Sequence, residues 1–111
     1  MDKRKKFLAA AAMLLLSGCA GAVKIGRINA DPSRYRNQMV RVSGTVVNSV
    51  GALGTGGYQV EDGTGSIFVI SRKGVPSRGS RVTVTGRVFP GAEVLGQPVG
   101  TAIREQNHTV K

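Results

Sequence analysis

The chain has few of the residues on which enzymes and metal proteins depend. Its 111 residues include one cysteine, one histidine, no tryptophan and six acidic side chains. A metal site needs several converging ligands, and the only adjacent acids, Glu61 and Asp62, would point to opposite faces of a strand. Nucleophilic catalysis needs a base beside the nucleophile, and the single histidine, His108, is close to the C-terminus, where we expect an exposed side chain. The sequence therefore predicts a non-enzymatic protein with no metal and no cofactor.

The chain also lacks an apolar segment long enough to cross a membrane. Its longest apolar run, Phe7 to Leu16, would rise only about 15 Å as a helix, against a hydrocarbon core of about 30 Å. Four basic residues, Lys3 to Lys6, precede this run, and Leu16-Ser17-Gly18-Cys19 ends it. A positive start, a short apolar stretch and a small-residue cleavage site are typical of an export signal. We therefore expect residues 1–18 to be removed as a signal peptide.

The end of this signal resembles the lipobox of bacterial lipoproteins. The resemblance covers the first 19 residues and implies that Cys19 is lipidated and becomes the first residue of the mature protein. Several acyl chains on one residue would give a lasting membrane anchor. In such lipoproteins, a residue other than aspartate after the cysteine, here Ala20, implies the outer membrane, on its periplasmic face. An ordinary secretory signal with an unmodified cysteine is the alternative.

The part that remains after processing has the composition of one small all-β domain. The chain has 16 glycines and several valine-rich segments, which favour strands joined by tight turns. Because no second cysteine is present, no disulfide can form within it. We expect a lipidated tether at residues 19–30 and a β domain at 31–111. A helical turn should follow Asp31-Pro32, since Asp can cap a helix and Pro suits its first position, with Ile28 and Tyr35 as apolar anchors.

Alternation of apolar and polar residues predicts five strands. They cover residues 40–47, 58–61, 66–71, 81–88 and, with a weaker pattern, 101–110. Asp62-Gly63-Thr64-Gly65 predicts a tight hairpin turn, and residues 72–80 and 90–100 read as loops. In this register Ile67 and Val69 point inward, whereas Phe68 and Ile70 point outward. The inverted register, with Phe68 and Ile70 in the core, is the alternative.

The segment Val60-Glu61-Asp62-Gly63-Thr64-Gly65-Ser66-Ile67 resembles the hairpin of OB-fold domains, which include anticodon-binding and single-strand-binding modules. The two Val-x-Val-x-Gly-x-Val segments, at 40–46 and 82–88, fall where OB-folds place strands one and four. The resemblance spans residues 39–110 and implies a small five-stranded OB-fold-like barrel with a short N-terminal helical turn. The usual helix between strands three and four is reduced here to the segment 72–80. An SH3-like barrel is the structural alternative.

Positive charge dominates the predicted mature chain. Four of the 16 basic and one of the six acidic residues precede Cys19, which leaves a formal charge of +7. A basic surface attracts polyanions in a salt-dependent way. OB-folds bind ligands across the outward faces of strands two and three, where Phe68 and nearby arginines would lie, beside the loop Gly51–Gly57. The predicted ligand-binding residues are Arg41, Gln59, Phe68, Arg72 and Arg87.

Together these patterns predict a membrane-anchored binding module of the bacterial cell envelope. Its partner would be an anionic ligand, such as lipopolysaccharide, nucleic acid or an acidic protein, because one fold serves many functions. One alternative is a single-stranded nucleic-acid-binding protein, in which bases stack on Phe68. Another is a structural component of an envelope protein complex, which would dock through a strand edge or through Ala52-Leu53 or Val94-Leu95.

Overall fold

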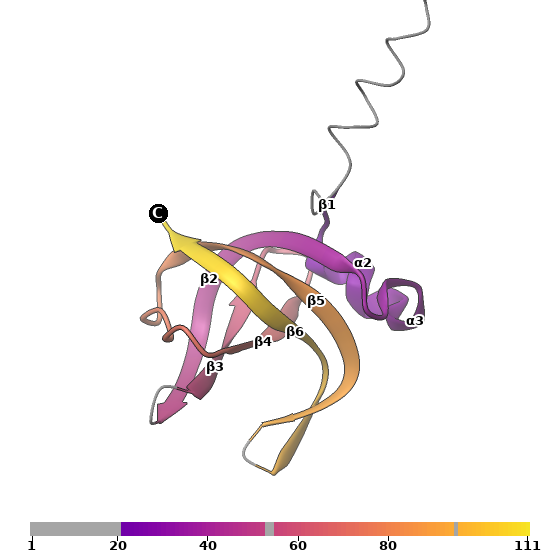
Figure 1. Ribbon diagram of the computed structural model, residues 1–111. Helices are drawn as coiled ribbons and strands as arrows, with labels where there is room; N and C mark the ends of the chain where they lie inside the picture. Colours follow the sequence, from indigo (N-terminus) through magenta and orange to yellow (C-terminus); the bar gives the residue numbers. More distant parts are fainter. Residues whose placement is uncertain (1–20, 53–54, 95) are drawn as a thin grey trace, which may run out of the picture.

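The computed structural model describes residues 21–52, 55–94 and 96–111 (Figure 1). The predicted signal peptide and Cys19 lie outside these residues. No helix within the described segments is long and apolar enough to cross a membrane. The elements in chain order are β1 (Gly21–Ala22), α2 (Ile25–Ala30), α3 (Pro32–Tyr35), β2 (Met39–Ala52), β3 (Thr55–Glu61), β4 (Ser66–Ser71), β5 (Arg81–Val94) and β6 (Gln97–Val110).

Five strands close into a barrel because β2 pairs with both β3 and β5. The order across the sheet is β1-β2-β3-β4-β6-β5, with β2–β5 as the closing pair. The pairs β1–β2 and β4–β6 are parallel, and the other pairs are antiparallel. This arrangement confirms the predicted OB-fold-like barrel with a short helical segment before it. The two-residue strand β1 is an addition that the sequence did not predict.

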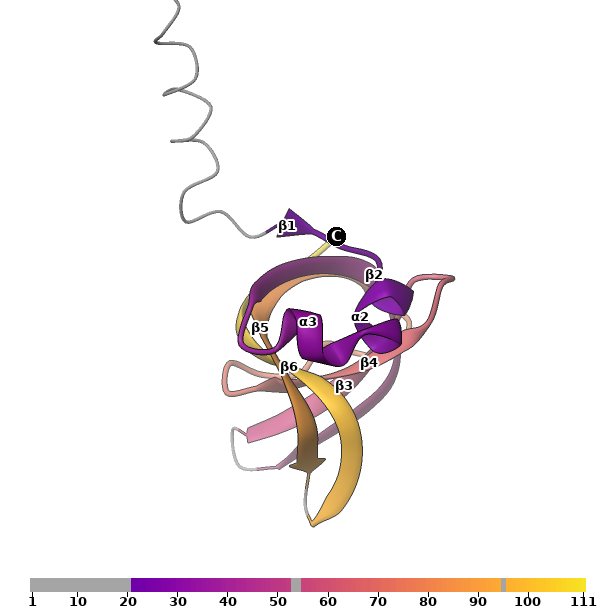
Figure 2. The ribbon, with the colours of Figure 1, turned by 90° about the vertical axis from the view of Figure 1, so that its right-hand side faces the viewer.

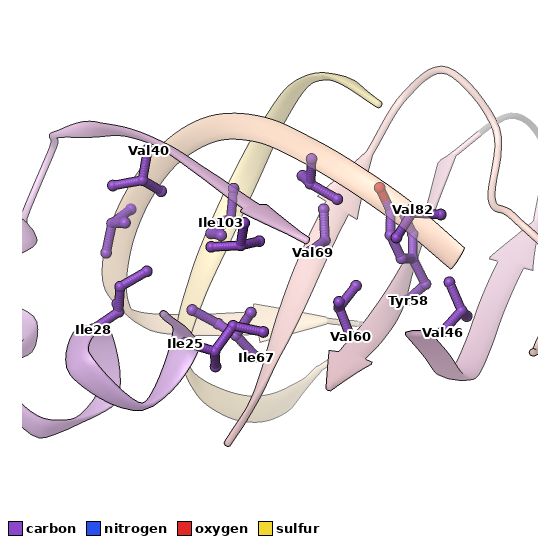
Figure 3. Close-up of a cluster of buried hydrophobic side chains, with 13 residues drawn as sticks. Ile25, Ile28, Val40, Val46, Tyr58, Val60, Ile67, Val69, Val82 and Ile103 are labelled. Carbon is purple, nitrogen blue, oxygen red and sulfur yellow. The ribbon is translucent and has the colours of Figure 1, made fainter. Parts of the chain in front are cut away.

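The barrel interior is filled by the valine and isoleucine residues that the alternation placed there (Figure 3). Along β4, Ile67 and Val69 are buried, whereas Phe68 and Ile70 are half-buried on the outer side. The predicted register of this strand is therefore confirmed, and the inverted register is wrong. The core described by the structure lies between Ile25 and Ile103, so a chain that starts at Ala20 contains all of it.

The N-terminal segment is more ordered than the predicted tether. Residues 25–30 form α2, in which Ile25 and Ile28 are fully buried. A spacing of three residues places both side chains on one face of a helix, and that face packs on the core. Figure 2 shows α2 and α3 lying across one open end of the barrel. The globular domain therefore begins at Ile25 or before, rather than at Asp31.

The segment 90–100, expected to be a loop, is largely strand. β5 continues to Val94 and β6 begins at Gln97, which makes a long hairpin. Gly91 and Gly100 adopt positive φ angles of 77° and 76°, and the pairing shifts register on both sides of Ala92. Such bulges allow glycine and proline to remain inside a paired ribbon. Glycine and proline content alone therefore gave the wrong prediction.

Asp62 joins the β3–β4 turn to the start of α2. Its Oδ2 accepts the Ile25 backbone N–H at 2.9 Å, and its Oδ1 accepts the Thr64 backbone N–H at 2.9 Å. The turn is the one that the sequence predicts, with Gly63 at φ 91°. Burial alone would raise the pKa of Asp62, but hydrogen bonds from Ile25, Thr64 and Gly65 lower it below the usual value. The ionised carboxylate is therefore the form that holds the helix.

We expect Asp62→Ala to lower the free energy of unfolding at neutral pH by about 1–2 kcal/mol, the usual effect of losing a helix cap. Because the folded-state pKa is lowered, the carboxylate stabilises the fold above its unfolded pKa of about 3.9, and this contribution disappears as the pH falls through the folded pKa. Urea unfolding at a series of pH values measures both effects. If the variant and the parent lost the same free energy of unfolding between neutral and acidic pH, this role of the carboxylate would be contradicted.

Candidate ligand-binding site

A row of side chains crosses the outer surface of four adjacent strands. The pairing places Gln59, Phe68, Ala102 and Phe89 side by side on β3, β4, β6 and β5. Residues that precede or follow them in the strands, such as Val69 and Ile103, are fully buried, so this row faces outward. Both phenylalanine residues are half-buried, and Ala102 between them is fully buried. Phe68 and Phe89, on either side of the buried Ala102, therefore form an apolar strip on the outside of the barrel, with Gln59 at its edge.

A second outward row carries positive charge. It consists of Gly57, Ile70, Arg104 and Arg87, again paired across β3, β4, β6 and β5. The guanidinium of Arg104 lies 4.7 Å from the centre of the Phe89 ring, in the range of a cation–π contact. Arg87 donates a hydrogen bond to the Asn37 carbonyl oxygen at 2.9 Å.

The two arginines are cross-strand neighbours of equal charge, an arrangement that costs stability. Among the residues that the structure describes, the only ion pair joins His108 and Glu105. Within those limits, neither Arg87 nor Arg104 has a carboxylate partner. Both guanidinium groups therefore retain hydrogen-bond donors that an external phosphate or carboxylate could accept.

The absence of a side chain at Gly57 allows the Phe68 ring to lie against the backbone of β3. A Cβ atom at position 57 would stand only 2.2 Å from Cε2 of Phe68. The aromatic ring therefore covers the glycine backbone, which is why it is less exposed than the sequence predicted.

A pocket of about 540 Å³ opens beside the second row. It lies within the usual size range of small-molecule sites, about 300–1,000 Å³. Its lining combines an apolar wall with three cations and one exposed acid, Glu93: Ile70, Arg72, Lys73, Phe89, Glu93, Arg104 and Glu105. We call Phe68, Ile70, Arg72, Arg87, Phe89, Ala102 and Arg104 the outer-face patch. The patch is suited to a ligand that combines an anionic group with a flat or apolar group.

The structure brings together most of the residues that the sequence proposed. Phe68, Arg72 and Arg87 belong to the outer-face patch, and Gln59 lies beside Phe68 and donates to the Ser66 hydroxyl at 3.0 Å. Arg41 is elsewhere: it is exposed on β2, opposite Thr85 of β5 and next to β1. The proposed grouping of Arg41 with Phe68 is therefore not what the structure shows.

Two residues of the outer-face patch, Phe89 and Arg104, were not among the predicted ligand-binding residues. Phe89 follows Val88 in the clean alternation of the fourth strand, so its outward position could have been found by extending that pattern by one residue. Arg104 follows the buried Ile103 in the weakly patterned last strand, where no clear signal was present. Among the described residues, no cluster of acidic, histidine or cysteine side chains could hold a metal ion.

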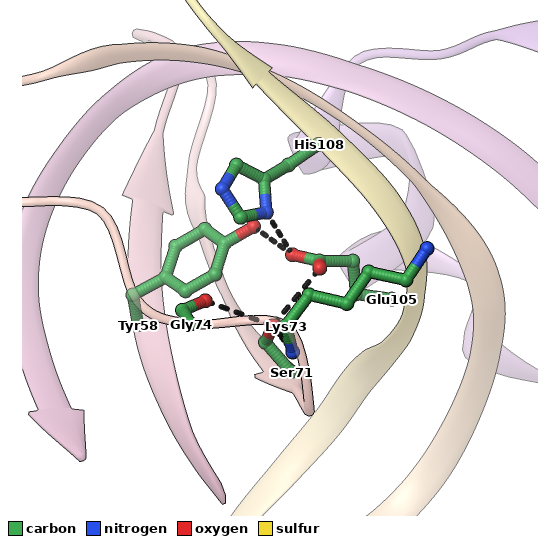
Figure 4. A network of polar contacts seen from close by, with 6 residues as sticks. All are labelled: Tyr58, Ser71, Lys73, Gly74, Glu105 and His108. Atoms are coloured by element: carbon green, nitrogen blue, oxygen red, sulfur yellow. Dashed lines mark hydrogen bonds and ion pairs between the residues drawn. The ribbon is translucent and has the colours of Figure 1, made fainter. Parts of the chain in front are cut away.

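Beneath the patch, a buried carboxylate ties three strands together (Figure 4). Glu105 on β6 has a fully buried side chain that accepts from Ser71 Oγ of β4 at 2.9 Å and from the Tyr58 hydroxyl of β3. Its Oε1 lies 2.8 Å from Nδ1 of His108. Burial, and then the hydrogen bond to Glu105 and its charge, raise the pKa of Tyr58 well above the usual value, so the phenol remains a donor.

His108 is thus not the exposed residue that the sequence predicted, because its side chain is only 15% exposed. A bulge explains its position: Thr85 pairs with Asn107 and Gly86 with Glu105, which leaves Gln106 without an opposite residue on β5. The extra residue turns His108 to the same side of the strand as Glu105. The ring of His108 also packs edge-on against that of Tyr58, with centroids 5.7 Å apart.

Comparison with known proteins supports the fold. No family model and no curated protein matches the sequence. OBody AM3L09, bound to hen egg-white lysozyme, has a TM-score of 0.56 at 18% identity, over 69% of this chain and 84% of that one. Asparaginyl-tRNA synthetase from Pyrococcus horikoshii has a TM-score of 0.55 at 19% identity. The match covers 69% of this chain and 20% of the synthetase. A Leishmania major Friedlin protein assigned as an aspartyl-tRNA synthetase has a TM-score of 0.60 at 12% identity. The match covers 93% of this chain and 26% of that protein. Such low identities establish the fold alone, an OB-fold-like barrel.

Proposed function

We propose that this chain is a lipid-anchored protein of the bacterial envelope whose barrel binds an anionic ligand on the outer-face patch, without catalysis. The observation that carries the proposal is the apolar strip of Phe68, Ala102 and Phe89 directly beside Arg87 and Arg104. A guanidinium group binds phosphate or carboxylate with two parallel hydrogen bonds, and a phenylalanine ring offers a face on which a flat apolar group can stack.

Single-stranded nucleic acid is the first ligand class to test. It combines phosphates with flat bases, and two of the structural neighbours are by name aminoacyl-tRNA synthetases, which act on a nucleic acid. Phosphorylated sugars of lipopolysaccharide share the anionic group but lack the aromatic base. Binding of such phosphorylated sugars should depend on the arginines and much less on the phenylalanine rings.

The membrane anchor depends on the lipobox at Leu16-Ser17-Gly18-Cys19. Within this proposal, Ala20 after the lipidated cysteine directs the protein to the outer membrane, facing the periplasm. The intact mass of the protein purified from membranes should show an acylated N-terminal cysteine, and Cys19→Ala should abolish that modification. A mature protein that starts at another residue, or an unmodified Cys19, would contradict the anchor and leave the ligand site to be judged separately.

Binding by the soluble chain Ala20–Lys111 tests the patch. We expect Phe89→Ala to weaken binding of a single-stranded oligonucleotide roughly 5- to 150-fold, since stacking one base on an aromatic ring contributes about 1–3 kcal/mol. Arg87→Glu with Arg104→Glu should weaken binding of every anionic ligand and reduce the salt dependence. Fluorescence anisotropy at two salt concentrations measures both.

Arg78→Glu supplies the matched control, because Arg78 is exposed in the loop after β4 and lies outside the patch. It makes the same change of charge as Arg87→Glu or Arg104→Glu alone, the single variants with which it is compared, and should leave the affinity nearly unchanged. An equal loss in the Arg78 variant would mean that net charge, rather than the patch, attracts the ligand.

A further inference from the structure

A second basic surface lies where the chain enters the barrel. The strand β1 pairs in parallel with β2, with Gly21 beside Val40 and Ala22 beside Arg41, and the Val23 N–H donates to the Arg41 carbonyl oxygen at 3.0 Å. These contacts fix the first described residues against the barrel wall. They border a pocket of about 360 Å³, which we call the anchor-side pocket, lined by Ala22, Val23, Lys24, Arg41, Ser43, Asp62 and Arg81.

Most of the charged side chains that line this pocket are basic and exposed to solvent. Lys24, Arg41 and Arg81 are all exposed, whereas the carboxylate of Asp62 already accepts hydrogen bonds from Ile25 and Thr64. Glu61 lines a smaller adjoining pocket of about 250 Å³, next to Arg81. Three cations therefore face solvent here. Of the two acids, Asp62 is held by its hydrogen bonds and Glu61 lies in the adjoining pocket.

The anchor-side pocket is also close to the predicted lipid. Cys19 precedes Gly21 by two residues, so a fully extended chain separates their Cα atoms by at most about 7 Å. Figures 1 and 2 show β1 on one side of the barrel and the far ends of the β2–β3 and β5–β6 hairpins on the opposite side. A lipid on Cys19 therefore brings the pocket, and not the hairpin end, to the bilayer.

We propose that the anchor-side pocket contacts anionic lipid headgroups, so that the barrel sits on the bilayer with its hairpin end directed away. This inference depends on the lipid anchor of the proposed function. A lasting anchor together with nearby basic residues is a combination that holds proteins against anionic membranes. Each Lys or Arg near such a surface strengthens the contact about fivefold. The cations then serve to orient the barrel rather than to bind the soluble ligand.

Spin labels on the acylated protein test this orientation. One label is attached through Ser43→Cys in the anchor-side pocket and another through Val50→Cys, which is exposed near the hairpin end. Collision with a water-soluble paramagnetic reagent is measured in vesicles of phosphatidylcholine, with and without phosphatidylglycerol. We expect the label at position 43 to become severalfold less accessible only when phosphatidylglycerol is present, and the label at position 50 to remain accessible in both.

Charge reversal provides the matching variant. Arg41→Glu with Arg81→Glu should restore the accessibility of position 43, while circular dichroism shows that the barrel is folded. Equal accessibility of position 43 in the two kinds of vesicle, with Cys19 acylated by mass, would overturn the orientation and leave the proposed function intact. An unacylated Cys19 would overturn the orientation and the anchor together.

Discussion

Replacing Glu105 with alanine is expected to lower the free energy of unfolding by about 3–5 kcal/mol, because each buried donor left without an acceptor costs about 1–3 kcal/mol. The carboxylate side chain is fully buried and is bound by Tyr58, Ser71 and His108. Its loss leaves a buried phenol and imidazole without their acceptor. Urea unfolding followed by circular dichroism measures the change, since the chain contains no tryptophan.

Two further variants show whether the network acts as a unit. Tyr58→Phe alone should cost about 1 kcal/mol, but should cost almost nothing more in the Glu105→Ala background, because the hydroxyl has already lost its acceptor. The exposed Glu61→Ala is the control and should stay within about 0.5 kcal/mol of the parent. If Glu105→Ala were as mild as Glu61→Ala, the carboxylate would have to be hydrated rather than buried.

Gly86→Val is expected to destabilise the barrel by more than about 4 kcal/mol, enough to unfold many small domains. A Cβ atom at this position would stand 2.3 Å from the Arg104 carbonyl oxygen and 2.6 Å from Cγ2 of Ile103. The first of these atoms belongs to the backbone of β6, so it cannot move aside without breaking the β5–β6 pairing. Circular dichroism and thermal unfolding report the outcome.

Gly21→Val is the matched control, because a Cβ atom at position 21 would meet nothing within 4 Å. Gly86→Ala is the milder variant and should already lower the melting temperature, since the close contact involves the Cβ atom itself. A Gly86→Ala protein as stable as the parent would show that β5 and β6 can separate at this point without cost.

The sequence correctly predicted which residues face inward wherever the pattern within a single strand is sufficient to decide it. Alternating valines predicted the inward faces of β2 and β5, and the same alternation correctly turned Phe68 outward. A glycine inside a strand pattern favours a bend or bulge, and the register of β5 and β6 does shift between Thr85 and Gly86. By contrast, α2 has only two buried residues, which is too short a pattern to distinguish a helix from a tether.

The candidate site was less predictable because it depends on which strands are neighbours. Arg104 lies near Phe89 only because β6 pairs with β5, and His108 meets Glu105 only because Gln106 is an extra residue in that pairing. The register between two strands does not follow from the pattern of either one. Arg41 was misplaced for the same reason: the start of β2 pairs with β5 and β1, rather than with β3.

The central claim is that the soluble anionic ligand binds the outer-face patch, whereas the anchor-side pocket is left to contact the membrane. Amide chemical-shift mapping of the soluble chain Ala20–Lys111, titrated with a single-stranded oligonucleotide and with a phosphate mimic of lipopolysaccharide, tests it most directly. We predict saturable shifts that cluster at Phe68, Ile70, Phe89 and Arg104 and persist at moderate salt. Oligonucleotide shifts centred on Lys24, Arg41 and Arg81, or diffuse shifts that disappear with salt for both titrants, would contradict it.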